Sequence, residues 1–297
     1  MAMISGTSVR PEGYGRAVPV FTVDVEDWFQ VSAFDGHVSR DQWDALPSRV
    51  ERNTDRLLQV CADTGTRGTF FTLGWVAERF PSLVQRIVGQ GHEIASHGYW
   101  HQRITTISEV QFREDIRRAK GTLEDTAGVV VNGYRAPSFS LTDAVPWALD
   151  VLYSEGHRYD SSRFPIARPG YGTAVGERTP HFLRLSSGES LAEYPPAVWP
   201  LLGMQIPVAG GGWFRQFPEK VIHMGLSAVL EGCQPAVFYI HPWEIDAEQP
   251  RLPVGLTTRI RHYRNLRATE PRLRNLLSRW RFTSFADMMN TGIAGRT

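Results

Sequence analysis

Short apolar runs alternate with helical patterns along most of the chain. Seven runs have strand-like composition, and several of them are nearly continuous in apolar residues, as expected of strands buried on both faces: 18–25, 68–75, 93–97, 131–136, 158–161, 191–194 and 236–241. Helical spacing of apolar residues predicts helices over 48–63, 76–89, 108–126, 143–154 and 219–231. Alternating strands and helices form parallel sheets through right-handed crossovers, so the pattern predicts an α/β fold. About seven such units in this length favour a barrel over an open sheet.

The pattern changes after residue 250, where arginine becomes frequent. Four apolar residues of this segment share one helical face: Leu273, Leu276, Leu277 and Trp280. We therefore predict an N-terminal arm (1–17), a barrel domain (18–250) and an Arg-rich helical C-terminal extension packed on the barrel (251–297). A solvated helix face is the simpler interpretation of these arginines, and contact with anionic glycans or lipid phosphates is the alternative.

Composition and charge narrow the class of protein. The chain has 297 residues, of which 42% are hydrophobic and 21% charged, as in ordinary globular proteins. Its formal net charge of +1 argues against a general nucleic-acid binder. The N-terminal residues lack the apolar core of a secretory signal, so a cytoplasmic location is the expectation. Cys61 and Cys233 lie far apart in the sequence and are expected to be buried thiols.

Carboxylates follow the first apolar run directly, at Asp24, Glu26 and Asp27. In a parallel barrel the C-terminal ends of the strands gather the functional side chains. Because like charges this close repel, we expect a cation or an arginine beside them. A surface turn explains the same residues about as well.

Two histidines, His97 and His101, follow the third run. Histidines four residues apart can lie on one face of a helix and bind one metal ion. With a carboxylate they make the open three-ligand site of a hydrolytic metal. Two unrelated histidines among the nine in the chain are the alternative.

The fourth run ends at Arg135, Pro137 and Ser138, and the last run ends at His241. Arg135 is expected to pair with Asp24 and keep that carboxylate ionised, although a surface ion pair is the commoner role of an arginine. Because Pro137 has no N–H, the N–H of Ser138 is a candidate oxyanion donor. His241 is a candidate general acid or base that Asp160 would orient, and a hydrogen-bonded core histidine is the alternative.

Taken in order, these motifs resemble the NodB-homology polysaccharide deacetylases, carbohydrate esterase family four. The resemblance rests on five segments of the chain: 22–27, 97–101, 135–137, 160–165 and 240–242. The forms Asp-Val-Glu-Asp-Trp and His-Pro-Trp-Glu are most similar to a branch encoded with exopolysaccharide and exosortase loci, which carries a C-terminal extension. The resemblance implies a distorted (β/α)7 barrel of the NodB-homology type. It also implies a divalent metal, commonly zinc, with cobalt or another divalent ion as the alternative.

The resemblance also implies roles for the motif residues. Asp24 would be the catalytic base and His241 the acid that protonates the departing amine, while His97, His101 and a carboxylate would hold the metal. The family's first motif has adjacent aspartates, but Val25 follows Asp24 here. Relatives with an Asp-x-Asp form point to Glu26 as the third ligand, and Asp27 is the alternative.

The implied substrate is an N-acetylated sugar in an exopolysaccharide or a lipid-linked glycan precursor, and O-acetyl groups are an open alternative. Four tryptophans near the motifs are candidates to stack on sugar rings: Trp28, Trp100, Trp213 and Trp243. A lipid-linked substrate would allow loose association of the basic tail with the inner membrane. An allantoinase-like hydrolase of a ureide or other amide, and a catalytically inactive glycan-binding barrel, are the other interpretations.

Overall fold

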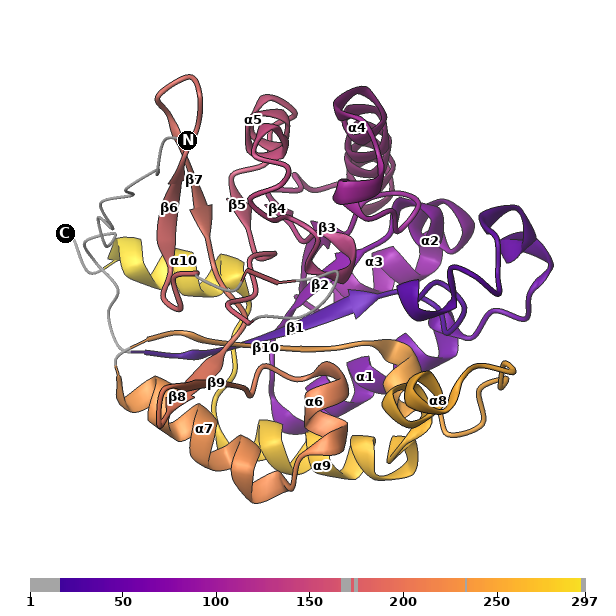
Figure 1. Cartoon of the computed structure of the whole chain (residues 1–297), viewed down its shortest axis with the longest axis vertical. Helices are drawn as coiled ribbons and strands as arrows, with labels where there is room; N and C mark the ends of the chain where they lie inside the picture. Colours follow the sequence, from indigo (N-terminus) through magenta and orange to yellow (C-terminus); the bar gives the residue numbers. More distant parts are fainter. Residues whose placement is uncertain (1–16, 167–171, 174–175, 233, 295–297) are drawn as a thin grey trace.

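A curled sheet of mainly parallel strands forms the centre of the molecule (Figure 1). The computed structural model describes residues 17–166, 172–173, 176–232 and 234–294, so nearly all of the predicted N-terminal arm and Cys233 lie outside the described residues. Seven strands pair in parallel in the order β10–β1–β2–β3–β4–β5–β7, and β6 joins β7 antiparallel at the edge. Their bounds are β1 Pro19–Val25, β2 Thr69–Thr72, β3 Glu93–Ser96, β4 Gly133–Tyr134, β5 Tyr159–Asp160, β6 His181–Arg184, β7 Ser190–Glu193 and β10 Ala236–Ile240.

The chain after β7 bends back to β10 and curls the sheet toward a barrel. Pro196 and Val237 form an isolated parallel bridge, and the N–H of Ala197 donates to the carbonyl of Val237 at 3.0 Å. All seven predicted β-rich runs coincide with the seven parallel strands. The predicted α/β class and distorted (β/α)7 barrel are therefore confirmed.

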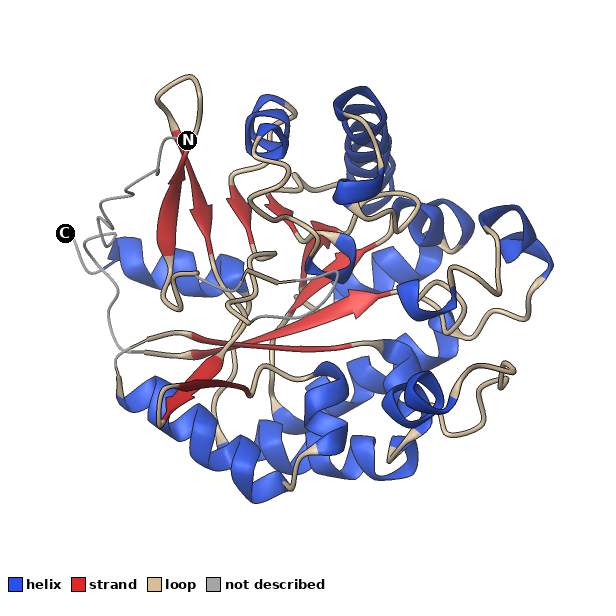
Figure 2. Ribbon diagram, in the orientation of Figure 1, coloured by secondary structure: helices blue, strands red, loops and turns tan. Residues whose placement is uncertain are grey.

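Helices cover the outer side of the curled sheet (Figure 2). Four of the five predicted helices are present: α1 Val50–Thr64, α4 Glu109–Ala127, α5 Trp147–Ser154 and α7 Glu219–Glu231. The fifth, predicted over 76–89, is split into α2 (Gly74–Arg79) and α3 (Pro81–Gly89). Pro81 has no N–H to continue a helix but suits the first turn of a new one, so the break falls before it.

The sequence pattern missed the antiparallel parts of the fold. These are β6 and the hairpin of β8 (Val198–Leu201) and β9 (Met204–Pro207). Both lie at the periphery and are only partly buried, so they lack the continuous apolar character of the central strands.

The C-terminal segment forms α8 (Leu256–Tyr263), α9 (Leu266–Arg279) and α10 (Phe285–Ala294). Leu273, Leu276 and Leu277 are buried as predicted, whereas Trp280 follows the end of α9 and is half-buried. Between α9 and α10, Thr283 donates its N–H to the carbonyl of Pro19 at 3.0 Å. Together with the fully buried Phe285, this contact fastens the segment beneath the N-terminal ends of the strands.

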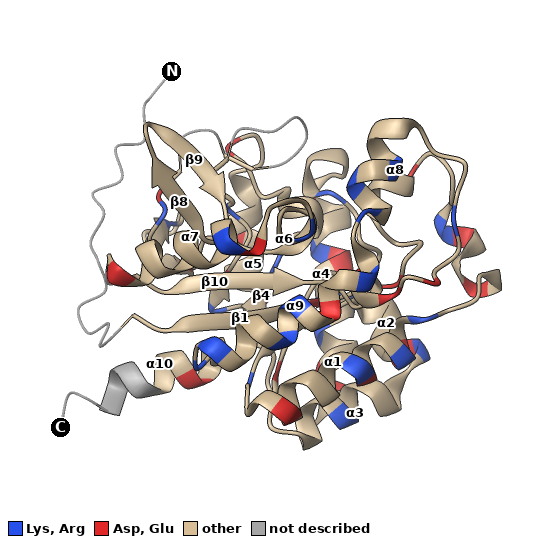
Figure 3. Cartoon of the chain, turned by 90° about the horizontal axis from the view of Figure 1, so that it is seen from below, with Lys and Arg blue, Asp and Glu red and all other residues tan. Residues whose placement is uncertain are grey.

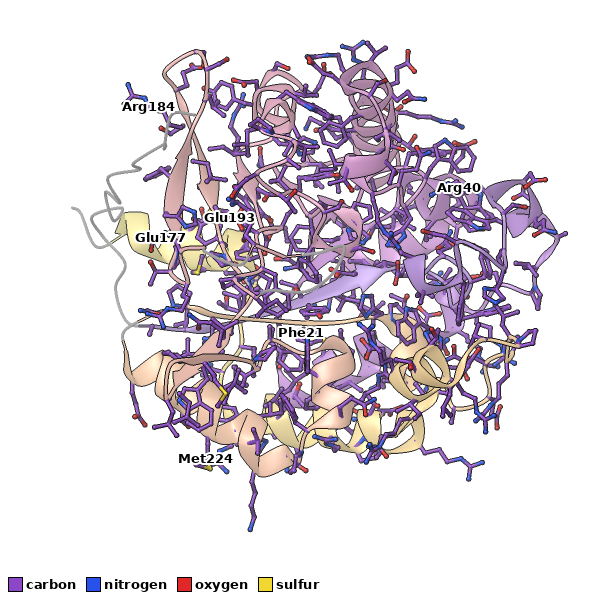
Figure 4. All side chains as sticks on the ribbon, in the orientation of Figure 1. Phe21, Arg40, Glu177, Arg184, Glu193 and Met224 are labelled. Atoms are coloured by element: carbon purple, nitrogen blue, oxygen red, sulfur yellow. The ribbon has the colours of Figure 1, made fainter. Side chains whose placement is uncertain are left out.

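The largest hydrophobic cluster lies between β1, β10 and the helices beside them, where Phe21 is fully buried (Figure 4). Cys61 is buried in this cluster. No helix within the described ranges has the length and apolar character that a membrane span requires.

Candidate active site

Eight of the fourteen predicted site residues line one pocket of about 500 Å³. It opens at the C-terminal ends of the parallel strands, where the chemistry of a parallel barrel is expected. Six lining residues come from the strand-end motifs: Asp24, Glu26, His97, His101, Ser138 and His241. Residues more than two hundred positions apart in the sequence thus meet in one place.

Glu26, His97 and His101 form a cluster that can hold a metal ion. One ligand atom from each lies within 4.8 Å of the others, and His101 Nε2 is 2.7 Å from a Glu26 carboxylate oxygen. His97 Nδ1 is 2.8 Å from the carbonyl oxygen of Arg135 and donates to it, so Nε2 is the free ligand atom. Burial lowers the pKa of His97 to about 4, so the ring is neutral and competent to bind a metal. Two imidazoles and one carboxylate suit a catalytic zinc ion.

The carboxylate of Glu26 is held in its charged form. Burial alone would raise its pKa, but His101, His241 and His97 together hold the pKa of Glu26 well below its usual range. Trp243 donates its indole N–H to Glu26 Oε1 at 3.0 Å and orients the carboxylate.

Asp27, the alternative ligand, points away from this cluster. One of its carboxylate oxygens accepts from the hydroxyl of Ser48 at 2.5 Å and from the backbone N–H groups of Arg49 and Val50 at 2.8 and 3.1 Å. These donors lie at the N-terminus of α1, where a carboxylate satisfies free N–H groups and the helix dipole. The interpretation of Asp27 as a ligand is therefore wrong, and Glu26 is the carboxylate of the cluster.

The two histidines do not share a helical face. They belong to a loop after β3, in which His101 has a left-handed backbone with φ of 51°. Asp115, buried on α4, accepts from the N–H groups of Tyr99 and Trp100 at 2.8 and 3.0 Å. Arg40 also donates to the carbonyl of Trp100 at 2.8 Å. This clamp, rather than helical periodicity, brings the rings together.

The predicted ion pair between Arg135 and Asp24 is present. Arg135 Nη1 lies 2.7 Å from Asp24 Oδ1, and the arginine is fully buried. Its other nitrogens donate to the carbonyl and hydroxyl of Ser161 at 3.0 and 2.8 Å. The second oxygen of Asp24 lies 3.8 Å from His241 Nε2. One carboxylate oxygen is thus committed to Arg135 while the other lies beside the candidate acid.

Glu244, not Asp160, orients His241. His241 Nδ1 is 2.5 Å from Glu244 Oε1, and Glu244 is in turn 2.6 Å from Nε of the buried Arg215. Burial alone would lower the pKa of His241, but the bond to Glu244 and the charges of Glu26, Glu244 and Asp24 raise it to about 9. The sequence carried a signal for Glu244, because a Glu three residues after a helix-capping residue matches capping-box spacing.

Asp160 instead supports the strand end that carries Arg135. It accepts from the hydroxyl of Ser162 at 2.5 Å, and that hydroxyl accepts from the N–H of Ala136 at 2.7 Å. Asp160 also lies opposite Glu193 across the β5–β7 pair. Burial raises the pKa of both carboxyls, so the pair favours retaining a proton.

Of the four tryptophans, two line the pocket. Trp28 is buried in the core and donates to the carbonyl of Pro47, so its predicted sugar contact is wrong. Trp100 is half-buried and does not line the pocket, and its contact with a sugar stays a prediction. Trp243 lines the pocket, but His241 and His262 stack on it at ring-centroid distances of 5.1 and 4.2 Å, so its faces are not available to a sugar. Trp213, on α6 (Gly211–Gln216), lines the pocket and remains a candidate for stacking.

The backbone is strained beside the pocket. Ser138 and Phe139 in the short helix η4 (Pro137–Phe139) have φ of 54° and 52°, values that residues other than glycine rarely adopt. Such conformations concentrate at functional sites. Ser138 lines the pocket and donates its hydroxyl to Ser32 at 2.6 Å, while the proposed role of its N–H and of Pro137 in an oxyanion hole stays a prediction.

Two family models match the chain. Residues 41–155 match the polysaccharide deacetylase family, and residues 161–290 match a domain of unknown function, DUF3473. The second match crosses residue 250, where the composition suggested a boundary.

Curated relatives match part of the chain. The peptidoglycan-N-acetylglucosamine deacetylase of Bacillus cereus is 32% identical over 33% of this chain and 36% of its own length. The bifunctional xylanase/deacetylase of Pseudobutyrivibrio xylanivorans is 30% identical over 36% of this chain and 18% of its own. The peptidoglycan deacetylase of Helicobacter pylori is 24% identical over 47% of this chain and 43% of its own. The matches thus span less than half the length of these relatives.

Solved structures share the fold over nearly the whole chain. A Mycobacterium smegmatis protein assigned to the polysaccharide deacetylases matches with a TM-score of 0.67 at 20% identity, covering 98% of this chain and 95% of its own. The Puue allantoinase matches with a TM-score of 0.61 at 16% identity, covering 99% and 95%. At these identities the likeness shows the fold alone.

Proposed function

Because the family model and the curated relatives support membership of the NodB-homology polysaccharide deacetylases, carbohydrate esterase family four, we propose that this chain is a metal-dependent hydrolase that removes N-acetyl groups from a sugar. The observation that carries the proposal is the convergence of three potential ligands within 4.8 Å, in the pocket that also holds Asp24 and His241. That arrangement provides a metal site, a base and an acid for amide hydrolysis.

The residues around the pocket divide the proton transfers between them. A divalent ion held by Glu26, His97 and His101 would polarise the acetyl carbonyl and lower the pKa of water. Asp24 has one oxygen committed to Arg135 and uses the other to take a proton from the attacking water. The oxygen of that water bonds to the acetyl carbon, and the N–H of Ser138 is proposed to stabilise the oxyanion.

His241 completes the reaction as the acid. Its pKa of about 9 keeps the ring protonated near neutral pH, so it can give a proton to the departing nitrogen as the carbon–nitrogen bond breaks. Acetate and the free amino sugar are then released. Glu244 holds the ring and stabilises its charged form throughout.

We also propose zinc as the metal, and an exopolysaccharide or a lipid-linked glycan precursor as the substrate. The substrate follows from the resemblance to the branch encoded with exopolysaccharide and exosortase loci. We place the enzyme in the cytoplasm, with loose inner-membrane association through its C-terminal extension. The exposed Leu256, Ile260 and neighbouring arginines of α8 support contact with an anionic lipid surface (Figure 3).

Acetate release tests the proposed reaction. The full chain, supplied with zinc or cobalt, should release acetate and free amines from N-acetylglucosamine oligomers, and chelation should stop the release. Asp24→Asn and His241→Ala should each lower the rate by about 10²-fold or more. Hydrolysis of allantoin without acetate release would favour the ureide reaction. Glycan binding with no hydrolysis by the metal-loaded protein would favour an inactive binding barrel.

A further inference from the structure

Acidic and basic residues line the pocket together. Asp24 and Glu26 are the only carboxylates among its described lining residues. Three arginines line the same pocket: Arg103, Arg215 and Arg261. Arg215 is paired with Glu244, but an uncharged acetamido sugar gives no electrostatic reason for the other two guanidinium groups.

Arg103 is only partly neutralised by the protein. Its Nη2 donates to the carbonyl of Ser32 at 3.2 Å and lies 3.4 Å from a carboxylate oxygen of the exposed Asp35. Its Nε is buried and has no hydrogen-bond partner among the described residues. A buried N–H without an acceptor is costly. Because the Arg103 side chain is 34% exposed and lines the pocket, it can turn so that its guanidinium donates to an anion there.

Arg261 lies on α8 and is exposed. No carboxylate of the described residues lies within 4.0 Å of its guanidinium. Its backbone is nevertheless fixed, because buried Arg215 donates to the carbonyls of Arg261 and His262 at 2.9 and 2.7 Å. Arg215 itself is fully engaged by these carbonyls and by Glu244, so Arg261 supplies the available charge on this side.

We propose that Arg103 and Arg261 recognise an anionic group, a carboxylate or a phosphate, carried by the acetylated sugar or its neighbour. The inference rests on the proposed deacetylase function and names its substrate class. Guanidinium groups bind both anions through paired N–H donors. Other arginines of α8, blue in Figure 3, would also attract an anionic glycan.

Matched pairs of sugars test this recognition. N-acetylmuramic acid carries a carboxylate, N-acetylglucosamine 6-phosphate carries a phosphate, and N-acetylglucosamine carries neither. Binding to the zinc-loaded full chain is measured by calorimetry, and acetate release is measured on the same sugars and on neutral N-acetylglucosamine oligomers. At least one anionic sugar should bind about tenfold more tightly than N-acetylglucosamine.

Variants separate the arginines from the metal, which also attracts anions. The double variant Arg103→Gln/Arg261→Gln should bring the ratio of anionic to neutral binding close to one. Arg259→Gln removes the same charge from an exposed position of α8 that does not line the pocket, and should keep the ratio. Thermal unfolding and zinc content of each variant confirm that the fold and the site persist.

Two results would overturn the inference: equal binding of anionic and neutral sugars by the unmodified chain, or an anionic preference that survives in the double variant. If neutral oligomers are still deacetylated in either case, the proposed deacetylase function stands and only the recognition of an anionic group fails. If no acetylated sugar is hydrolysed but the arginine-dependent preference is present, the recognition stands and the deacetylase function fails.

Discussion

Glu244→Gln tests whether a buried ion pair holds the acid of the site in place. Arg215 and Glu244 are 2% and 0% exposed, with Nε and Oε2 2.6 Å apart. Removing one partner of such a pair leaves an uncompensated buried charge and typically costs about 3–5 kcal/mol. Glutamine can still accept a hydrogen bond from Arg215, so we expect the free energy of unfolding to fall by about 3 kcal/mol, at the lower end of that range.

Arg215→Met should be the more damaging change. It leaves Glu244 unpaired and also removes the donor to the carbonyls of Arg261, His262 and Arg264. The double variant Glu244→Gln/Arg215→Met leaves no unpaired charge but does not restore these hydrogen bonds. The stability losses of the two single variants should therefore add up to about 2–3 kcal/mol more than the loss in the double variant.

Urea unfolding followed by circular dichroism gives the three free energies. Arg56→Gln is the control, because it breaks the exposed Arg56–Glu270 pair and should cost at most about 1 kcal/mol. In the acetate-release assay, Glu244→Gln should lower turnover by about 10–100-fold because it loosens His241. If the loss in the double variant equals the sum of the two single losses, the residues act independently and the pair does not hold His241 in place.

Four further variants probe the site and the core. His101→Ala should remove the bound ion and activity together, whereas His241→Ala should keep the ion and lose turnover; equal loss of metal in both would contradict the assigned roles. Asp115→Ala frees the two backbone N–H groups behind the histidine loop and should weaken metal binding by about 10–100-fold without unfolding the protein, as a metal titration would show. Burial lowers the pKa of His157 to about 3 in the folded protein, so as the pH falls the unfolded chain binds a proton at this residue before the folded protein does. Stability that is present above pH 6.5 should therefore be lost as the pH falls toward 3, and His157→Phe should lessen that loss in urea unfolding at pH 7 and 5; an unchanged difference between the two pH values would exclude this cause.

The strand-end residues were predictable because parallel strands bring their C-terminal ends to one side of a barrel. This geometry alone places Asp24, Arg135 and His241 together, and the apolar runs that precede them identify the strands. The peripheral antiparallel strands were not predictable from the same signal, since their mixed burial produces no continuous apolar run.

The conformation of the loops that carry the site residues could not be predicted from the sequence pattern. Glu26 and Asp27 both follow the end of β1, where the alternation of sides along a strand no longer tells which carboxylate points inward. The left-handed backbone of His101 likewise depends on tertiary contacts. Asp115 could have been singled out from the sequence, because it lies on the apolar side of α4 and a charged residue among buried helix positions usually has a partner.

A cobalt titration measures whether Glu26, His97 and His101 hold one divalent ion beside Asp24 and His241. Visible absorption of bound Co²⁺ is compared for the unmodified chain, Glu26→Gln and Asp27→Asn. We predict one bound ion in the unmodified chain and in Asp27→Asn, and loss of the bound-ion spectrum in Glu26→Gln. An unchanged spectrum in Glu26→Gln, or its loss only in Asp27→Asn, would contradict the account.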